Sequence, residues 1–86
     1  MKIELIQTCG ACPEQYDARY NGRTVGYLRL RHGFFSVECP YVGGEEVYCA
    51  EPDGAGLFEY YERSKYLKKA KKAIRKWLCA EVENND

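Results

Sequence analysis

Four of the five cysteines are spaced in a way that could hold a metal ion. Cys9 and Cys12 have the two-residue spacing of a zinc-binding pair, and Cys39 and Cys49 could complete a set of four thiolates. The second pair lacks this spacing, because its members lie ten positions apart. Buried free cysteine is the commoner alternative, and Cys79 is expected to pack within a helix. We predict no bound metal. The secondary zinc candidates are Cys9, Cys12, Cys39 and Cys49.

The stretch from residue 51 to residue 62 has the outline of a twelve-residue calcium loop. Asp53 stands at the third position, Gly56 at the sixth and Glu62 at the twelfth, where such loops place an oxygen ligand, a turn and a bidentate carboxylate. The outline is incomplete, because the fifth position is Ala55, which has no side-chain oxygen. We predict that no calcium binds. The secondary calcium candidates are Glu51, Asp53, Glu59 and Glu62.

Basic side chains gather near the end of the chain. Residues 63–76 hold eight of the thirteen lysines and arginines, although the net charge of the chain is zero. A cationic helix face could bind nucleic-acid phosphates, but the commoner alternative is a solvated face, and a nucleic-acid reader would more often use arginine. Since the chain is neutral overall, any polyanion binding must be local. The residues of this lysine face are Lys65, Lys68, Lys69, Lys72 and Lys76.

A second candidate surface combines arginine with aromatic side chains. Tyr27, Arg29 and Arg31 alternate along a predicted strand and so share one face, and Phe34 follows across a short turn. Tyrosine and arginine are enriched at binding hot spots, because they desolvate large rigid surfaces and still make directed hydrogen bonds. A simple outward sheet face is the alternative. We predict that this arginine–aromatic face anchors a larger partner and that the lysine face steers association.

The sequence gives little indication of a catalytic site. His32 is the only histidine, and it stands in a predicted turn. The sequence holds no nucleophile elbow, phosphate loop or paired-carboxylate cleft. We predict a protein that is not an enzyme and uses no cofactor.

Two turn signals organise the strands that would carry these residues. Asn21-Gly22 and His32-Gly33 each separate runs of β-favouring residues, as in two-residue hairpins. In the second hairpin, Leu30 would then face Phe35, and the apolar residues of both strands would share one face.

The first hairpin fits this pattern less well. Without an irregularity, Ala18 would face Val25, and the apolar residues would fall on the opposite side of the sheet from Leu28. Either Gly26 marks a bulge that reverses the faces, or both faces carry apolar patches. We predict the bulge.

The remaining segments complete an α+β domain of 86 residues. We predict an antiparallel β-meander of four to five strands over about residues 2–50, an acidic loop at 51–57 and one long C-terminal helix at about 58–80, packed on one face of the sheet. Trp77 should be buried against the sheet, and Glu59 should pair with Arg63 one helical turn away. Residues 82–86 should form a frayed acidic tail.

The cysteine count is odd, and the sequence contains neither an apolar signal segment nor a transmembrane run. These observations predict a cytoplasmic protein with reduced thiols and no membrane association. The oligomeric state stays open, with a dimer as one option.

Two stretches carry a resemblance to known proteins. C-G-A-C-P-E-Q-Y-D, from Cys9 to Asp17, and V-G-Y-L-R-L-R-H-G-F-F, from Val25 to Phe35, are similar to small uncharacterised proteins of bacteria, phages and prophages. The likeness covers most of the chain, but Ala55 departs from the aspartate-rich loop of those relatives. It brings no active site. It implies a setting, since small phage-type domains are often inhibitors of host machinery, including anti-CRISPR and other anti-defence proteins, and so implies docking on a host protein or ribonucleoprotein.

Overall fold

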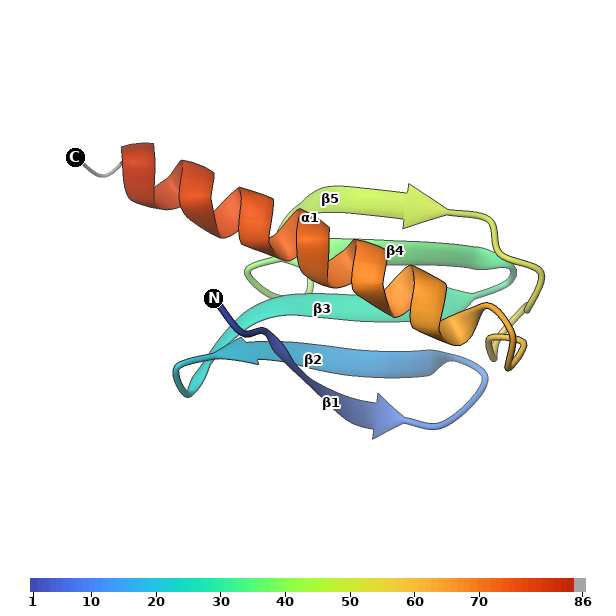
Figure 1. Ribbon diagram of the computed structural model, residues 1–86. Helices are drawn as coiled ribbons and strands as arrows, with labels where there is room; N and C mark the ends of the chain where they lie inside the picture. The colour runs from blue at the N-terminus through green and yellow to red at the C-terminus, as the bar shows by residue number, and fades with distance from the viewer. Residues whose placement is uncertain (85–86) are drawn as a thin grey trace.

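Five antiparallel strands pair in chain order to form one sheet, and a long helix follows them (Figure 1). The elements are β1 (Glu4–Cys9), β2 (Glu14–Tyr20), β3 (Arg23–Arg31), β4 (Phe34–Cys39), β5 (Glu45–Ala50) and α1 (Arg63–Asn84). This computed structural model describes residues 1–84. The predicted α+β meander with a C-terminal helix is confirmed, with five strands. The helix crosses one face of the sheet diagonally.

Both hairpin turns close as the sequence predicts. Asn21 and Gly22 have φ angles of 52° and 77°, and His32 and Gly33 have φ angles of 53° and 76°. Positive φ at both central residues gives the two-residue turn whose twist matches that of its strands. The strands that flank the second turn pair in the predicted register.

The predicted bulge lies at Val25 and Gly26. Arg19 pairs with Thr24, but Ala18 pairs with Gly26, so Val25 is an extra residue on β3. A bulge of one residue changes which face the following side chains point to. It places the apolar residues of β2 on the same side as those of β3 and β4.

Gly26 also sets how closely the helix approaches the sheet. A Cβ atom at this position would lie 2.9 Å from Cδ1 of Ile74, which is closer than carbon atoms normally pack. Ala18 beside it and Ala70 on the helix are small and fully buried. Small residues at the contact therefore let α1 lie directly on the bulge.

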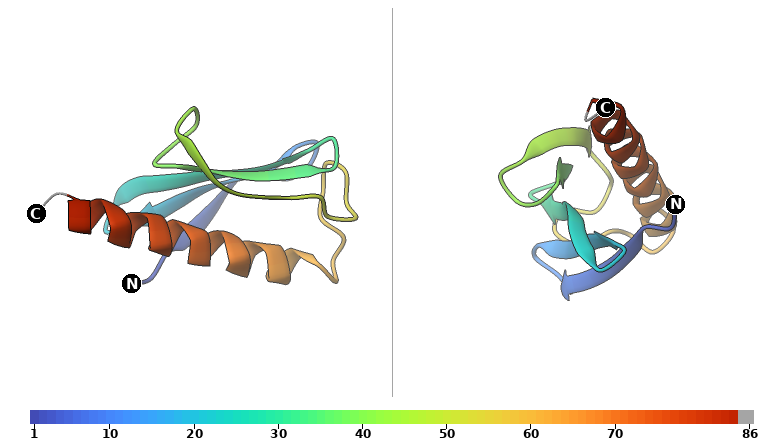
Figure 2. Two further views of the ribbon diagram at one scale, coloured as in Figure 1. Left: turned by 90° about the horizontal axis from the view of Figure 1, so that it is seen from above. Right: turned by 90° about the vertical axis from the view of Figure 1, so that its left-hand side faces the viewer.

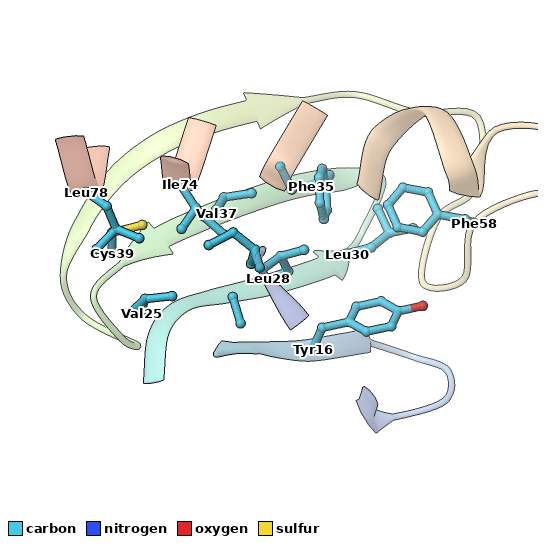
Figure 3. Packing of buried hydrophobic residues seen from close by; sticks show 13 residues of the cluster. Tyr16, Val25, Leu28, Leu30, Phe35, Val37, Cys39, Phe58, Ile74 and Leu78 are labelled. Atoms are coloured by element: carbon cyan, nitrogen blue, oxygen red, sulfur yellow. The ribbon is translucent and has the colours of Figure 1, made fainter. Parts of the chain in front are cut away.

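The core lies between the helix and one face of the sheet (Figure 3). On the helix, Ala70, Ile74 and Leu78 recur every four residues and face inward. The full set of core residues is Ile3, Tyr16, Ala18, Val25, Leu28, Leu30, Phe35, Val37, Cys39, Phe58, Ala70, Ile74 and Leu78.

The inward-facing row of the helix does not include Trp77, which the sequence predicts to be buried. Trp77 packs against the core but is only half-buried, so the expectation of full burial is corrected. The row of Ala70, Ile74 and Leu78 lies closest to the sheet. Trp77 lies about 100° around the helix from Leu78, at the edge of this contact. Tyr60 is 88% exposed and precedes the helix altogether.

The helix also starts and ends later than predicted, at Arg63 and Asn84 instead of about 58 and 80. Phe58 turns into the core, and Glu62 accepts a hydrogen bond from the Glu59 N–H, so the chain turns before it becomes helical. Residues 82–84 of the predicted frayed tail belong to the helix, and residues 85–86 lie outside the described residues. No helix within residues 1–84 is long and apolar enough to cross a membrane.

Candidate functional site

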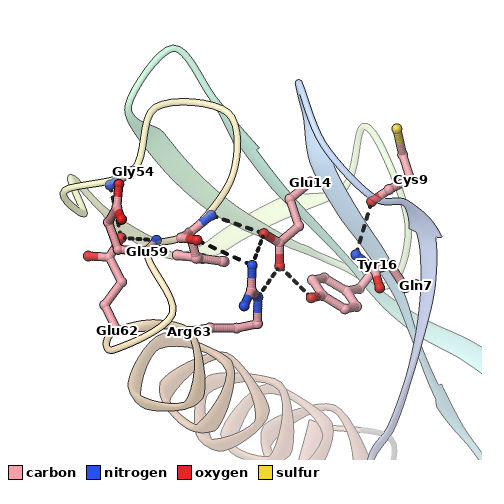
Figure 4. A network of polar contacts seen from close by, with 9 residues as sticks. Gln7, Cys9, Glu14, Tyr16, Gly54, Glu59, Glu62 and Arg63 are labelled. Carbon is pink, nitrogen blue, oxygen red and sulfur yellow. Dashed lines mark hydrogen bonds and ion pairs between the residues drawn. The ribbon is translucent and has the colours of Figure 1, made fainter.

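A buried carboxylate links the sheet to the start of the helix (Figure 4). The side chain of Glu14 is fully buried and forms an ion pair with Arg63, whose Nε donates to Oε2 at 2.9 Å and whose Nη2 donates to Oε1 at 3.1 Å. The Phe58 N–H donates to Oε1 at 3.0 Å, and the Tyr16 hydroxyl donates to Oε2. The sequence had suggested that Arg63 pairs with Glu59, but in the structure it pairs with Glu14. Four hydrogen bonds from three residues, each on a different segment, therefore meet at one carboxylate.

The surroundings of this cluster shift the pKa values of Glu14 and Tyr16 in opposite directions. Burial by itself raises the pKa of Glu14, but the hydrogen bonds from Arg63, Tyr16 and the Phe58 N–H, with the Arg63 charge, outweigh it and lower the pKa below its ordinary value. Burial, with the hydrogen bond to Glu14, raises the pKa of Tyr16 to about 12. At neutral pH the carboxylate stays ionised and the phenol neutral, so neither group is poised to exchange a proton.

Two carboxylates of the stretch from residue 51 to residue 62 accept hydrogen bonds from donors within the same stretch. Glu62 is 5% exposed, and its carboxylate accepts the backbone N–H groups of Asp53, Gly54 and Glu59, each at 2.9 Å. The Asp53 carboxylate accepts the hydroxyl of Tyr61. Oxygens of Asp53 and Glu62 that a calcium ion would need already accept these hydrogen bonds, and Glu62 holds the loop together.

The same loop ties two turns of the sheet to the helix. The Gly56 carbonyl accepts the N–H groups of Cys12 and Glu14, both at 2.8 Å, and the Ala55 carbonyl accepts the Gly33 N–H at 2.7 Å. These bonds close the end of the sheet at which β1, β3 and β5 finish. The acidic loop is therefore an ordered clip, a role that its sequence did not suggest.

The four secondary zinc candidates are not brought together into one group. Cys9 and Cys39 lie at opposite ends of the sheet, because they end strands that run in opposite directions. Cys39 faces the core, where burial raises its pKa to about 12, whereas Cys12 and Cys49 are exposed. Within residues 1–84, no three His, Cys, Asp or Glu side chains form a group that could hold a metal ion. Cys79 is exposed as well and does not pack within the core.

The helix covers one face of the sheet (Figure 2), and the residues of the arginine–aromatic face alternate with the core residues and so lie on the other face. Tyr27, Arg29 and Arg31 alternate with the core residues of β3, and Phe34 pairs with Arg31 across the turn. Arg31 and Phe34 are exposed, while Tyr27 and Arg29 are half-buried. Asp17 of β2 lies beside Tyr27. The strand register thus brings the four predicted residues together on one face, over which the described chain places no helix or strand.

The lysine face is exposed, but grooves on both flanks of the helix divide it. A groove of about 620 Å³, here called the β5 groove, lies between α1 and β5 and is bordered by Lys69, Lys72 and Lys76. A pocket of about 530 Å³, here called the β1–β2 pocket, lies between the first half of α1 and the strands β1 and β2, and Lys68 borders it. Lys65 lies over the ring of Tyr66, with Nζ 5.1 Å from the ring centre.

His32 is exposed in its turn, as expected.

Comparisons with models of protein families, with curated proteins and with solved structures found no match to this chain. Function has to be argued from the surfaces described above.

Proposed function

We propose that this protein is a non-enzymatic binding protein that docks on a larger host protein or ribonucleoprotein complex and blocks it. The observation that carries the proposal is the open sheet face, where Tyr27, Arg29, Arg31 and Phe34 lie together on the central strands. The likeness to small phage and prophage proteins, within which anti-CRISPR and other anti-defence inhibitors occur, agrees with this role.

The chemistry of the face indicates what kind of partner surface it fits. Arg29 and Arg31 offer planar guanidinium groups that bind carboxylates through two parallel hydrogen bonds, and Tyr27 and Phe34 offer flat apolar area beside them. β3 and β4, which carry these four residues, are each paired on both sides, so the backbone beneath the side chains is rigid and need not be ordered on binding. A complementary partner presents carboxylates next to an apolar patch.

The test begins with capture of the partner from host lysate and rests on the binding kinetics of variants. We expect Arg29→Ala with Arg31→Ala to weaken the complex by roughly thirty-fold or more, mainly through faster dissociation, because hot-spot contacts act on the lifetime of a complex. Arg23→Ala is the matched control, since Arg23 is an exposed arginine at the other end of the same strand. Surface-plasmon kinetics measure both effects.

Neutralising Lys65, Lys68, Lys69 and Lys72 should mainly slow association, because exposed flexible charges steer the encounter. If the lysine variant abolishes binding while the arginine pair has no effect, the anchor is the helix and the proposed face is wrong.

A second candidate function is nucleic-acid binding through the lysine face. The observation that favours it is the exposure of Tyr60 and Tyr61, at 88% and 61%, just before the lysine-bearing helix. Exposed aromatic rings beside a cationic path are the features with which proteins stack and track single strands. A gel shift with a random single strand at low salt tests this function, and a lack of binding there would exclude it.

A further inference from the structure

The β1–β2 pocket has the composition of a small anion-binding site. Its floor is apolar, formed by Leu5, Tyr16 and Leu67, and its rim carries the basic side chains of Arg63, Lys68 and Lys71. Its volume is about 530 Å³, and it is open to solvent on one side. No carboxylate lines the pocket among the residues that the structure describes.

The spacing of residues along α1 brings the polar side chains that line the β1–β2 pocket together. Ser64, Lys68 and Lys71 follow one another at four- and three-residue steps, so they lie on the same flank of α1 above β1 and β2. Arg63 is fixed beside them by its two hydrogen bonds to Glu14. The pocket is therefore built on a helix whose first turn is anchored to the sheet.

Charge distinguishes this pocket from the β5 groove on the other flank. Lys69, Lys72 and Lys76 border the β5 groove, but so do Glu45 and Glu46, which offset much of the positive charge. The β1–β2 pocket contains no such pair of glutamates. Lysines therefore border both flanks of the helix, but only those at the β5 groove have glutamates beside them.

The uncompensated charge of the pocket matches a phosphate monoester. Glu14 neutralises Arg63, with which it pairs, so Lys68 and Lys71 are left as two positive charges at the rim. A phosphate monoester carries about −1.5 to −2 charges at pH 7. The Ser64 hydroxyl at the same rim can donate a further hydrogen bond to a phosphate oxygen.

Tyr60 supplies the second element of recognition. Its ring borders the pocket and is 88% exposed, and it touches the Tyr61 ring edge-on with 5.9 Å between centres. An exposed ring at the mouth of a cationic pocket can stack on a nucleobase. We propose that the β1–β2 pocket binds a nucleoside monophosphate group, with the phosphate at Lys68 and Lys71 and the base against Tyr60. This site is separate from the arginine–aromatic face and does not depend on its function.

The proposal can be tested by NMR titration of the ¹⁵N-labelled protein with adenosine monophosphate at low salt. We expect saturable shifts of the Ser64, Lys68 and Leu5 amides. The indole N–H of Trp77 should not move, because Trp77 lines the β5 groove on the other flank. Adenosine and inorganic phosphate should each bind at least roughly ten-fold more weakly, since each lacks one half of the contacts.

The matched variants separate the pocket from general charge attraction. Lys68→Ala with Lys71→Ala should weaken binding by roughly ten-fold or more, whereas Lys69→Ala with Lys72→Ala, which removes the same charge from the other flank, should change it less than about two-fold. Equal losses in the two variants, shifts centred on Trp77, or no saturable shift with the nucleotide would overturn the proposal. Well-dispersed spectra of each variant establish that it is folded.

A 5′-phosphorylated trinucleotide identifies the source of the group. Binding at least about ten-fold tighter than that of the mononucleotide indicates the end of a nucleic-acid strand, since neighbouring nucleotides then add contacts along the lysine face. Equal or weaker binding indicates a free nucleotide. In both cases the Lys68 and Lys71 variant must lose affinity for the ligand.

Discussion

At the scale of the residue, the most informative side chain is Glu14. It is 1% exposed, and each of its oxygens accepts hydrogen bonds from Arg63 and from a second donor. A buried carboxylate is costly unless such donors surround it. Glu14 therefore commits β2, the loop before the helix and the first turn of α1 to a single arrangement.

We expect Glu14→Gln to lower the free energy of unfolding by about 3 kcal/mol, the lower end of the range for breaking a buried ion pair, because the 35% exposed Arg63 side chain can regain water. Arg63→Met should be similarly destabilising at pH 7. In that variant burial of Glu14 is no longer offset by the arginine, so its pKa rises. The stability difference from the unmodified protein should then shrink as the pH falls from 7 to 4.

Urea denaturation at several pH values measures both effects. Arg23→Met is the control, because Arg23 is exposed. A constant stability difference for Arg63→Met across this pH range would show that the ion pair does not set the pKa of Glu14.

At the scale of the element, the helix contacts the sheet through small residues at its centre. Gly26, Ala18 and Ala70 allow close approach, and Ile74 fills the space above the bulge. Because of this close approach, the burial of a helix residue does not follow the size of its side chain. Ile74 is fully buried, whereas the larger Trp77 is only half-buried at the edge of the β5 groove.

Ile74→Ala should accordingly destabilise the protein by about 3 kcal/mol, through lost burial and the cavity left behind. Trp77→Ala should cost less, about 1–2 kcal/mol, since its side chain is only partly buried. Thermal and urea melts give both values, with the exposed Lys76→Ala as control. A larger loss for Trp77→Ala would mean that the indole lies deeper than described.

At the scale of the whole molecule, carboxylates that accept hydrogen bonds hold one end of the fold together, where the acidic loop and the start of the helix meet the sheet. Burial raises the pKa of Glu62, but the backbone N–H groups of Glu59, Asp53 and Gly54 outweigh it and leave the pKa below its ordinary value, as for Glu14. A carboxyl whose pKa is lowered in the folded state stabilises above its unfolded pKa, near 4.5, and that stability is lost as the pH falls through the folded value.

We therefore expect the free energy of unfolding to be nearly constant from pH 6 to 8 and to fall below about pH 4.5. Glu62→Gln should cost about 1 kcal/mol at pH 7 and flatten the acid limb, because the variant has one fewer carboxylate to protonate. Glu59→Gln is the control, since Glu59 is exposed. An acid limb as steep in Glu62→Gln as in the unmodified protein would contradict this account.

The sequence by itself determined the meander, its turns and its bulge. These features depend on neighbours a few residues apart: two positions that accept positive φ, and an alternation of apolar residues that is consistent only if one residue is extra. The same alternation placed Tyr27, Arg29 and Arg31 on one face.

Only the tertiary structure decided how the helix and the acidic loop are used. Glu14 and Arg63 are 49 residues apart, and no local pattern marks them as partners. The start of the helix, the stripe that it buries and the role of Glu62 follow from where the loop 51–62 crosses the end of the sheet. The cysteines were separated by strand direction and by face. Such contacts join segments that are far apart in the chain and form only when the elements pack together. They therefore leave no short-range pattern in the sequence.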